Sequence, residues 1–306
     1  MKKRVHMFEH DPNRTIQNIP SREEIASLAY NSTGKATGPA LWVLHGIMGS
    51  KQNWSRFARY LSQRFPELYI ITIDLRCHGE TPHIQGPHTL RACVDDLKHL
   101  AQQIGSPEVI IGHSFGGKVA LKYAAEDQHN DHAHLTEGSS RLKSVWTLDS
   151  PLAAELRPGH DEVARVIEAC ATLKMPQPNR QALIEAFDEH GFSRGIGQWM
   201  TTNIRRLLPH EERGEGFVWR FDIEGIRALI SDYWRVDGWQ LLSEIPPNIQ
   251  LHLLRAERGM RWTEEDARRV AEIRPEAHTP VLADSGHWVH IDQLEALIEM
   301  IGQAGL

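Results

Sequence analysis

Residues 109–117 read Val-Ile-Ile-Gly-His-Ser-Phe-Gly-Gly, and this stretch decides the fold. Its apolar start predicts a buried strand, and the apolar spacing from Lys118 to Ala125 predicts a helix. Between them, the pattern Gly-x-Ser-x-Gly places Ser114 on a sharp turn, whose strained backbone needs the small neighbours that the two glycines supply. Such a strand–turn–helix projects the serine hydroxyl above the carboxyl ends of the strands, beside a helix start that favours negative charge. Ser114 is therefore the candidate nucleophile.

The same alternation of strand and helix continues on both sides of Ser114. Continuous apolar runs separated by helical patterns are typical of a parallel sheet covered on both faces, so the sequence predicts an α/β fold with a mostly parallel, doubly wound sheet. The predicted strands are 41–45, 68–74, 109–111, 145–148, 249–254 and 280–283, and the predicted helices are 54–61, 90–104, 118–125 and 294–301.

Residues 152–245 interrupt this alternation. They contain no clear strand–helix–strand unit, but they hold helical patterns, one of them running from Trp199 to Leu207, and four of the nine tryptophans. A connection of this length must carry its own structure. We therefore expect a helical lid at 152–245, inserted into a core formed by 25–151 and 246–306, with an N-terminal extension at 1–24.

Composition excludes several classes of protein. The 306 residues carry 34 Lys and Arg against 40 Asp and Glu, a net charge of −6, which disfavours a nucleic-acid-binding protein. The three cysteines, Cys77, Cys93 and Cys170, lack the spacing of a disulfide framework or a zinc site, so no metal is expected. The sequence shows no P-loop or dinucleotide-binding motif, so no cofactor is expected either. The basic N-terminus has no apolar stretch behind it, and no run approaches the roughly 18 apolar residues of a membrane helix. A cytoplasmic protein without a membrane span is therefore expected.

A second glycine turn follows the first predicted strand, in His45-Gly-Ile-Met-Gly49. Gly46 lets the backbone fold back over the sheet. The N–H of Ile47 then points toward the same place as the N–H of Phe115, and two such donors form an oxyanion hole. An ordinary strand-to-loop turn is the alternative, but the position one strand–helix–strand step before Ser114 favours the oxyanion hole.

The candidate base follows the last predicted strand, in Asp284-Ser-Gly-His-Trp288. His287 lies on a loop beyond a strand end and before the final helix, which is where the base of a serine triad is needed late in the chain. His290 is the competing candidate, but the Gly286-His287 turn places the His287 imidazole at the apex of the loop.

These motifs together resemble the α/β-hydrolase superfamily, through His-Gly-x-x-Gly, Gly-His-Ser-x-Gly-Gly and a late Gly-His. More closely, residues 41–297 resemble the lid-bearing serine esterases of the abhydrolase-domain-containing protein 11 branch and their bacterial esterase relatives, through 45–54, Asp74-Leu-Arg-Cys-His-Gly79, 112–120 and 285–290. The resemblance implies the α/β-hydrolase fold, a Ser–His–acid triad and ester hydrolysis without a metal.

The resemblance also indicates where the acid lies. In most of the superfamily the acid follows the strand after the lid, where this chain has Gly259. In the resembled branch it follows the strand before the lid, which here ends at Asp149. Asp149 is therefore the predicted acid that orients His287. Glu257 and Asp266 are the alternative acids. Asp149 could also have no catalytic role and be a solvated carboxylate at a strand end or a cap for the first helix of the lid.

Two further polar groups invite a functional interpretation. The cluster His129-Asn-Asp-His-Ala-His134 suggests a metal, but its polar neighbours favour a solvated loop. Asp74 and Arg76 follow a strand and favour a buried ion pair that shapes the loop, over a metal or phosphate site.

The sequence thus predicts a serine hydrolase that cleaves small carboxylic esters through an acyl-enzyme. An acyl-CoA thioesterase and a non-catalytic binding protein with the same fold are the alternatives. The expected partner is a small ester or thioester, without nucleic acid, and the expected assembly is a monomer or homodimer. The candidate residues for binding the acyl group, all of which could instead pack in a core, are Met48, Trp199, Phe217, Trp219, Tyr233 and Trp234.

Overall fold

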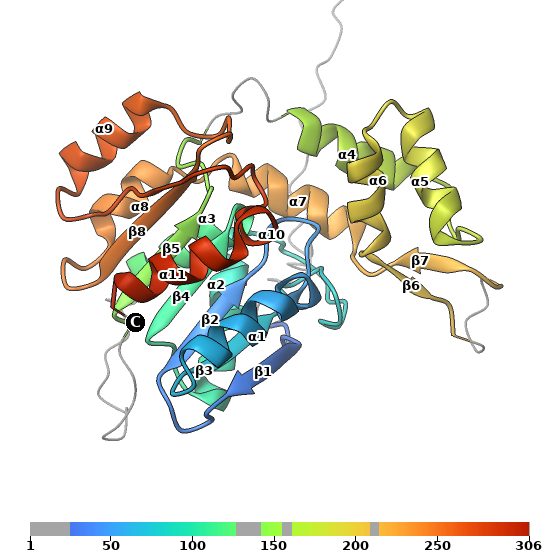
Figure 1. Ribbon diagram of the computed structural model, residues 1–306. Helices are drawn as coiled ribbons and strands as arrows, with labels where there is room; N and C mark the ends of the chain where they lie inside the picture. The colour runs from blue at the N-terminus through green and yellow to red at the C-terminus, as the bar shows by residue number, and fades with distance from the viewer. Residues whose placement is uncertain (1–24, 127–141, 155–160, 209–213, 306) are drawn as a thin grey trace, which may run out of the picture.

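A mixed, mostly parallel sheet lies at the centre of the chain (Figure 1). The computed structural model describes residues 25–126, 142–154, 161–208 and 214–305. The extension 1–24 and the histidine cluster 129–134 lie outside these residues. Within the described residues the sheet has seven strands in the order β1-β3-β2-β4-β5-β8-β9, of which β1 alone runs antiparallel to its neighbour. The strands are β1 (Tyr30–Gly34), β2 (Ala40–Leu44), β3 (Tyr69–Ile73), β4 (Val109–His113), β5 (Ser144–Leu148), β8 (Gln250–Ala256) and β9 (Val281–Leu282).

Helices cover both faces of this sheet, as the continuous apolar strands require. One face packs against α1 (Ser55–Arg64), which follows the short helix η1 (Lys51–Trp54), and against α11 (Leu294–Gln303). The other face packs against α2 (Leu90–Ile104), α3 (Phe115–Glu126) and α8 (Gly238–Glu244). Neighbouring residues of one strand belong to opposite cores, since Leu41 and Val43 face α1 whereas Trp42 and Leu44 face α3. The predicted α/β fold class is confirmed.

The chain between β5 and β8 forms an insert, and most of its described elements extend to one side of the sheet (Figure 1). Its helices α4, α5 and α6 and its hairpin stand beside the sheet, while α7 runs back toward α2. The remaining helices, α9 and α10, follow β8 and β9. The bounds are α4 Asp161–Thr172, α5 Arg180–Glu189, α6 Arg194–Thr201, β6 Ile204–Arg206, β7 Phe217–Trp219, α7 Ile223–Tyr233, α9 Glu264–Ile273 and α10 Val289–Asp292.

Two details differ from the sequence prediction. The helical pattern that was predicted to run to Leu207 ends at Thr201, because the backbone continues into β6, which pairs with β7 in an antiparallel hairpin. The edge strand β1 has no predicted counterpart, because its polar and mostly exposed residues carry no apolar pattern. No helix in the described residues is long and apolar enough to cross a membrane.

Candidate active site

The turn between β4 and α3 holds Ser114 at φ +51°, in the left-handed region. The Ser114 N–H donates to the Leu148 carbonyl over 3.0 Å, and the Ser150 hydroxyl donates to the Ser114 carbonyl over 2.6 Å. A Cβ on Gly112 would lie 2.2 Å from the Gly116 carbonyl oxygen. Only glycine therefore permits the turn that lifts Ser114 out of the sheet.

The loop after β9 brings His287 to the carboxylate that follows β5. Asp149 Oδ2 lies 2.7 Å from His287 Nδ1, and the Asp149 side chain is almost fully buried. Asp149 Oδ1 accepts the Ala256 N–H over 3.3 Å, so the two oxygens face different partners. The predicted distance between acid and base is therefore observed, whereas the roles of the two residues in a reaction stay a prediction.

The alternative acids face other partners. Glu257 is exposed and its Oε2 accepts the Asp284 N–H over 2.8 Å. Asp266 closes a capping box at the start of α9, where its Oδ2 accepts from the Thr263 N–H and hydroxyl, each over 2.8 Å. A Cβ on Gly259 would lie 2.9 Å from Asp149 Oδ1, so the Asp149 carboxylate already fills the space beside this glycine.

The competing base, His290, lies in a different environment from His287. Its ring stacks on Trp54, with the ring centroids 4.0 Å apart. Burial, and then the nearby His113, lower the pKa of His290 well below its usual value, so the ring is neutral. Its Nδ1 has no hydrogen-bond partner among the described residues. This environment favours packing for His290.

The loop after β2 lies directly against the nucleophile turn. A Cβ on Gly46 would approach the Ser114 Cβ to 3.4 Å, which brings the next backbone N–H, that of Ile47, close to the serine. Met48 is held at φ +55° and donates its N–H to His78 Nε2 over 3.0 Å. Neither the Ile47 N–H nor the Phe115 N–H has a hydrogen-bond acceptor in the part of the chain that the structure describes. Both donors are thus available to a ligand.

Two residues of the site were not foreseen. His113 Nε2 donates to the His287 carbonyl over 2.7 Å and so links the base loop, the loop after β9 that holds His287, to β4. Burial, with a smaller contribution from His287, lowers the pKa of His113 to about 3, which keeps this donor neutral. Arg261 Nε lies 2.9 Å from His287 Nδ1 and 3.9 Å from Asp149 Oδ2. His113 stands inside the Gly-x-Ser-x-Gly motif, but no sequence pattern marks Arg261.

Ser114 and His287 open into one cavity of ≈ 700 Å³. Its inner wall includes Ile47 and Trp54 from the core. The insert supplies apolar wall residues from α4 and α6, and charged residues also contribute to the lining. These lining residues are Val163 and Val166 on α4, Ile196 and Trp199 on α6, and Arg258 and Arg261 after β8.

Of the six predicted acyl-binding residues, only Trp199 lines this cavity. Met48 and Tyr233 are buried, and the Tyr233 ring packs 5.7 Å from Phe115. Trp234 packs edge-on against Tyr233. The two residues of the hairpin also lie elsewhere: Phe217 contacts Arg180, and Trp219 stacks on Phe221. Packing within the insert and against α3 accounts for these positions.

The strand-end pair Asp74 and Arg76 is buried, but the two side chains do not pair with each other. Asp74 Oδ2 lies 2.6 Å from Lys51 Nζ, and Asp74 Oδ1 accepts the Lys51 N–H. Arg76 forms a two-pronged pair with Asp96 on α2, at 2.6 and 2.7 Å. Both residues thus form buried ion pairs as expected, but each pairs with a residue from another segment of the chain.

Comparison with known proteins identifies the family. The model of the Alpha/beta hydrolase family matches residues 43–300. The mouse (Mus musculus) sn-1-specific diacylglycerol lipase ABHD11 is 29% identical over 284 residues, covering 90% of this chain and 83% of that protein. Esterase YbfF of Escherichia coli (strain K12) is 28% identical over 265 residues, covering 85% of this chain and 90% of that protein.

Among solved structures, a marine microorganism esterase superposes with a TM-score of 0.75 at 23% identity, over 91% of this chain and 99% of that one, and so shares the fold. The resemblance inferred from the motifs is confirmed by these relatives. The chain belongs to the alpha/beta hydrolase family and is a hydrolase related to these esterases and lipases.

Proposed function

We propose that this protein hydrolyses small carboxylic esters through an acyl-enzyme on Ser114. The observation that carries the proposal is the 2.7 Å contact between Asp149 Oδ2 and His287 Nδ1, in a loop that opens into the same cavity as Ser114. A carboxylate at Nδ1 holds the proton there and leaves Nε2 free to accept one from the serine.

In the first half of the reaction, His287 Nε2 takes the hydroxyl proton of Ser114 while Oγ bonds to the acyl carbon. The negative charge that develops on the carbonyl oxygen is stabilised by the N–H groups of Ile47 and Phe115. The tetrahedral intermediate then expels the alcohol, which receives its proton from His287. In the second half, His287 activates a water that attacks the acyl carbon, and the carboxylic acid leaves as Ser114 regains its proton.

The cavity supports a substrate with an apolar acyl group. Val166, Ile196 and Trp199 of the insert form part of the wall, and this wall of helices is the reason to assign 152–245 as a lid over the core at 25–151 and 246–306. One relative is named a diacylglycerol lipase and another an esterase, which supports an acyl ester as the substrate class.

The compartment and the assembly belong to the same proposal. The three cysteines are buried free thiols, which supports a reducing compartment such as the cytoplasm. The substrate partner is a small ester, and we propose a monomer or homodimer without nucleic acid. Light scattering of the purified protein measures the assembly, and a tetramer would contradict the proposal.

Replacing Ser114 by alanine tests the nucleophile. Ser114→Ala should lower kcat for p-nitrophenyl ester hydrolysis by about 10⁴-fold or more while the protein stays folded. The wild-type protein, but not the variant, should be labelled by a fluorophosphonate probe, which phosphonylates an activated serine. Labelling of both proteins at another serine would contradict the assignment, and labelling of neither would favour a non-catalytic protein. An acyl-CoA panel run beside the esters separates an esterase from a thioesterase.

A further inference from the structure

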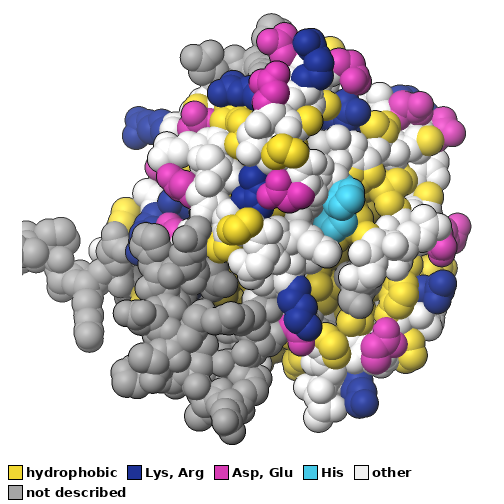
Figure 2. Space-filling view, turned by 90° about the vertical axis from the view of Figure 1, so that its left-hand side faces the viewer, with side chains coloured by type: hydrophobic (Ala, Val, Ile, Leu, Met, Phe, Trp, Pro, Cys, Tyr) yellow, Lys and Arg dark blue, Asp and Glu magenta, His cyan; other side chains and the backbone are white. Residues whose placement is uncertain are grey.

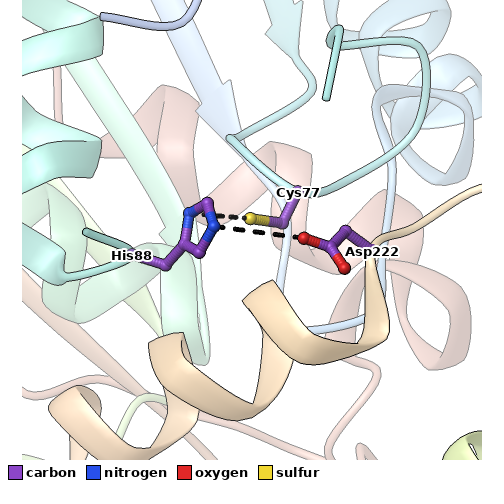
Figure 3. Close-up of side chains that lie close together, drawn as sticks. All are labelled: Cys77, His88 and Asp222. Carbon is purple, nitrogen blue, oxygen red and sulfur yellow. Dashed lines mark hydrogen bonds and ion pairs between the residues drawn. The ribbon is translucent and has the colours of Figure 1, made fainter. Parts of the chain in front are cut away.

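A second cluster of reactive side chains lies outside the active-site cavity, where the insert meets the core. Cys77 follows β3 at φ +66°, His88 precedes α2, and Asp222 caps the N-terminus of α7. Figure 3 shows the Cys77 thiol and the Asp222 carboxylate on the same side of the His88 ring, each joined to it by a dashed line. Three segments that are far apart in the sequence thus direct a sulfur, a nitrogen and an oxygen toward one place.

The distances between these atoms fit the binding of a single metal ion. The Cys77 Sγ lies 3.2 Å from His88 Nδ1, and His88 Nε2 lies 4.0 Å from Asp222 Oδ2. One ligand atom from each residue can be chosen so that all three lie within 4.8 Å of one another. Tetrahedral zinc, with bonds of about 2.0–2.3 Å, holds its ligand atoms roughly 3.3–3.8 Å apart. Small rotations of the side chains therefore close the site.

The surroundings leave the ligand atoms available. The Asp222 carboxylate is divided, since Oδ1 accepts the Glu224 N–H in the helix cap while Oδ2 faces the histidines. A Cβ on Gly225 would lie 2.4 Å from the Cys77 Sγ and 2.6 Å from Asp222 Oδ2, so glycine is needed for sulfur and oxygen to approach. Cys77 and Asp222 also line a surface hollow of ≈ 870 Å³, which supplies an entry path.

A fourth side chain of a metal-binding type, that of His83, lines the same hollow. His83 Nδ1 lies 3.3 Å from Asp222 Oδ2, on a side chain that is 68% exposed. Two histidines thus approach the same carboxylate oxygen. One thiolate and one carboxylate together carry two negative charges, which balance a divalent cation, and a thiolate with imidazoles selects zinc over magnesium or calcium.

We propose that Cys77, His88 and Asp222 bind one Zn²⁺, with the fourth position facing the hollow beside His83. Binding replaces the S–H bond by an S–Zn bond and releases the thiol proton to solvent. Without the cation the thiol is inert, because burial raises the pKa of Cys77 to about 12. Because Cys77 and His88 belong to the core and Asp222 to the insert, the ion would clamp α7 to the loop after β3. None of the three residues lines the active-site cavity, so the role is structural.

The full-length protein, stripped with a chelator and then freed of it, is titrated with Co²⁺ and with Zn²⁺. Wild type should bind one equivalent, show a thiolate-to-Co²⁺ absorption band in the near ultraviolet, and unfold at a higher temperature with Zn²⁺. Cys77→Ser should lose the band and bind Zn²⁺ at least about a hundredfold more weakly. Cys170→Ser is the matched control, since Cys170 is also a buried thiol with its pKa raised to about 12, but its sulfur contacts Met200.

Asp222→Asn supplies a second variant in case Cys77→Ser does not fold, because asparagine caps a helix as well as aspartate does. This variant should keep the cobalt band but bind Zn²⁺ more weakly than wild type. Wild-type protein without the band, or Cys77→Ser or Asp222→Asn binding Zn²⁺ as tightly as wild type, would overturn the proposal. Loss of the band in Cys170→Ser would also overturn it.

Discussion

In and near the candidate site, two buried carboxylates each contact different groups with their two oxygens. Asp149 gives one oxygen to the Ala256 N–H and the other to His287. Asp74 likewise accepts the Lys51 N–H with one oxygen and pairs with the Lys51 ammonium through the other. A buried charge is costly unless it is fully hydrogen-bonded, so these contacts make each carboxylate tolerable and hold the nearby loops in place.

Asp149→Asn should leave the stability nearly unchanged and lower kcat for ester hydrolysis by about 10⁴-fold. The amide can still accept the Ala256 N–H, but it favours the imidazole tautomer that cannot take the serine proton. Steady-state kinetics and a denaturant titration of the same preparation measure the two effects. Glu257→Gln and Asp266→Asn are the controls. A larger loss of kcat in either variant would show that the acid follows the strand after the insert.

At the scale of elements, α6 of the insert forms part of the cavity wall. Ile196 and Trp199 lie on this helix and face the cavity, and the Trp199 ring approaches Trp288 of the base loop to 5.7 Å. The helix begins with a good cap, since the Ser193 hydroxyl accepts the Ile196 N–H. Its position therefore determines the shape of this wall of the cavity.

Trp199→Ala should enlarge the cavity and shift the preferred acyl chain toward longer esters, with kcat/KM for long over short chains rising by roughly tenfold. A series of p-nitrophenyl esters measures this profile. Trp234→Ala is the control from the same insert: it removes packing on Tyr233 and should lower stability by up to about 3 kcal/mol without moving the profile. An unchanged profile in Trp199→Ala would assign Trp199 to packing alone.

Charge and burial act across the whole molecule. Figure 2 shows acidic and basic side chains intermixed over one face, in keeping with the net charge of −6. In the interior, by contrast, several histidines are buried and neutral. Burial is the largest cause that lowers the pKa of each of these histidines: His45, His78, His113, His252 and His290.

The protein should therefore lose stability as the pH falls from about 6.5 toward 4. In this range the histidines of the unfolded chain bind protons, whereas the same histidines stay neutral when they are buried in the folded protein. The free energy of unfolding therefore decreases with falling pH, by up to about 1.4 kcal/mol per pH unit for each fully buried histidine. Denaturant titrations at several pH values measure the slope.

His252→Phe isolates one contribution to this slope. The ring stacks 4.1 Å from Trp146, and burial, with a smaller contribution from His278, lowers the pKa of His252 to about 4. Phenylalanine keeps the stacking but does not titrate, so the slope between pH 6.5 and 4 should be shallower than in wild type. An equal slope would mean that other groups dominate acid unfolding.

The core of the fold and the turn at Ser114 could be predicted from sequence because their signals are local. Each buried parallel strand is a continuous apolar run, and the turn at Ser114 is encoded by the glycines on both sides of it. The contact between Asp149 and His287 was predicted through the family resemblance, which places the acid after the strand before the insert. The strand ends alone left Glu257 and Asp266 as alternatives, because the carboxyl ends of parallel strands meet at one edge of the sheet.

Only the tertiary structure decided the features that depend on how distant segments pack. Helical periodicity in the insert marks buried faces, but it does not tell whether a face meets the cavity, as Trp199 does, or a neighbouring element, as Tyr233 does. The partners of Lys51 and the convergence of Cys77 with Asp222 likewise join residues far apart in the chain. No periodicity or spacing in the sequence marks such contacts, because they form only when loops of the core pack against helices of the insert.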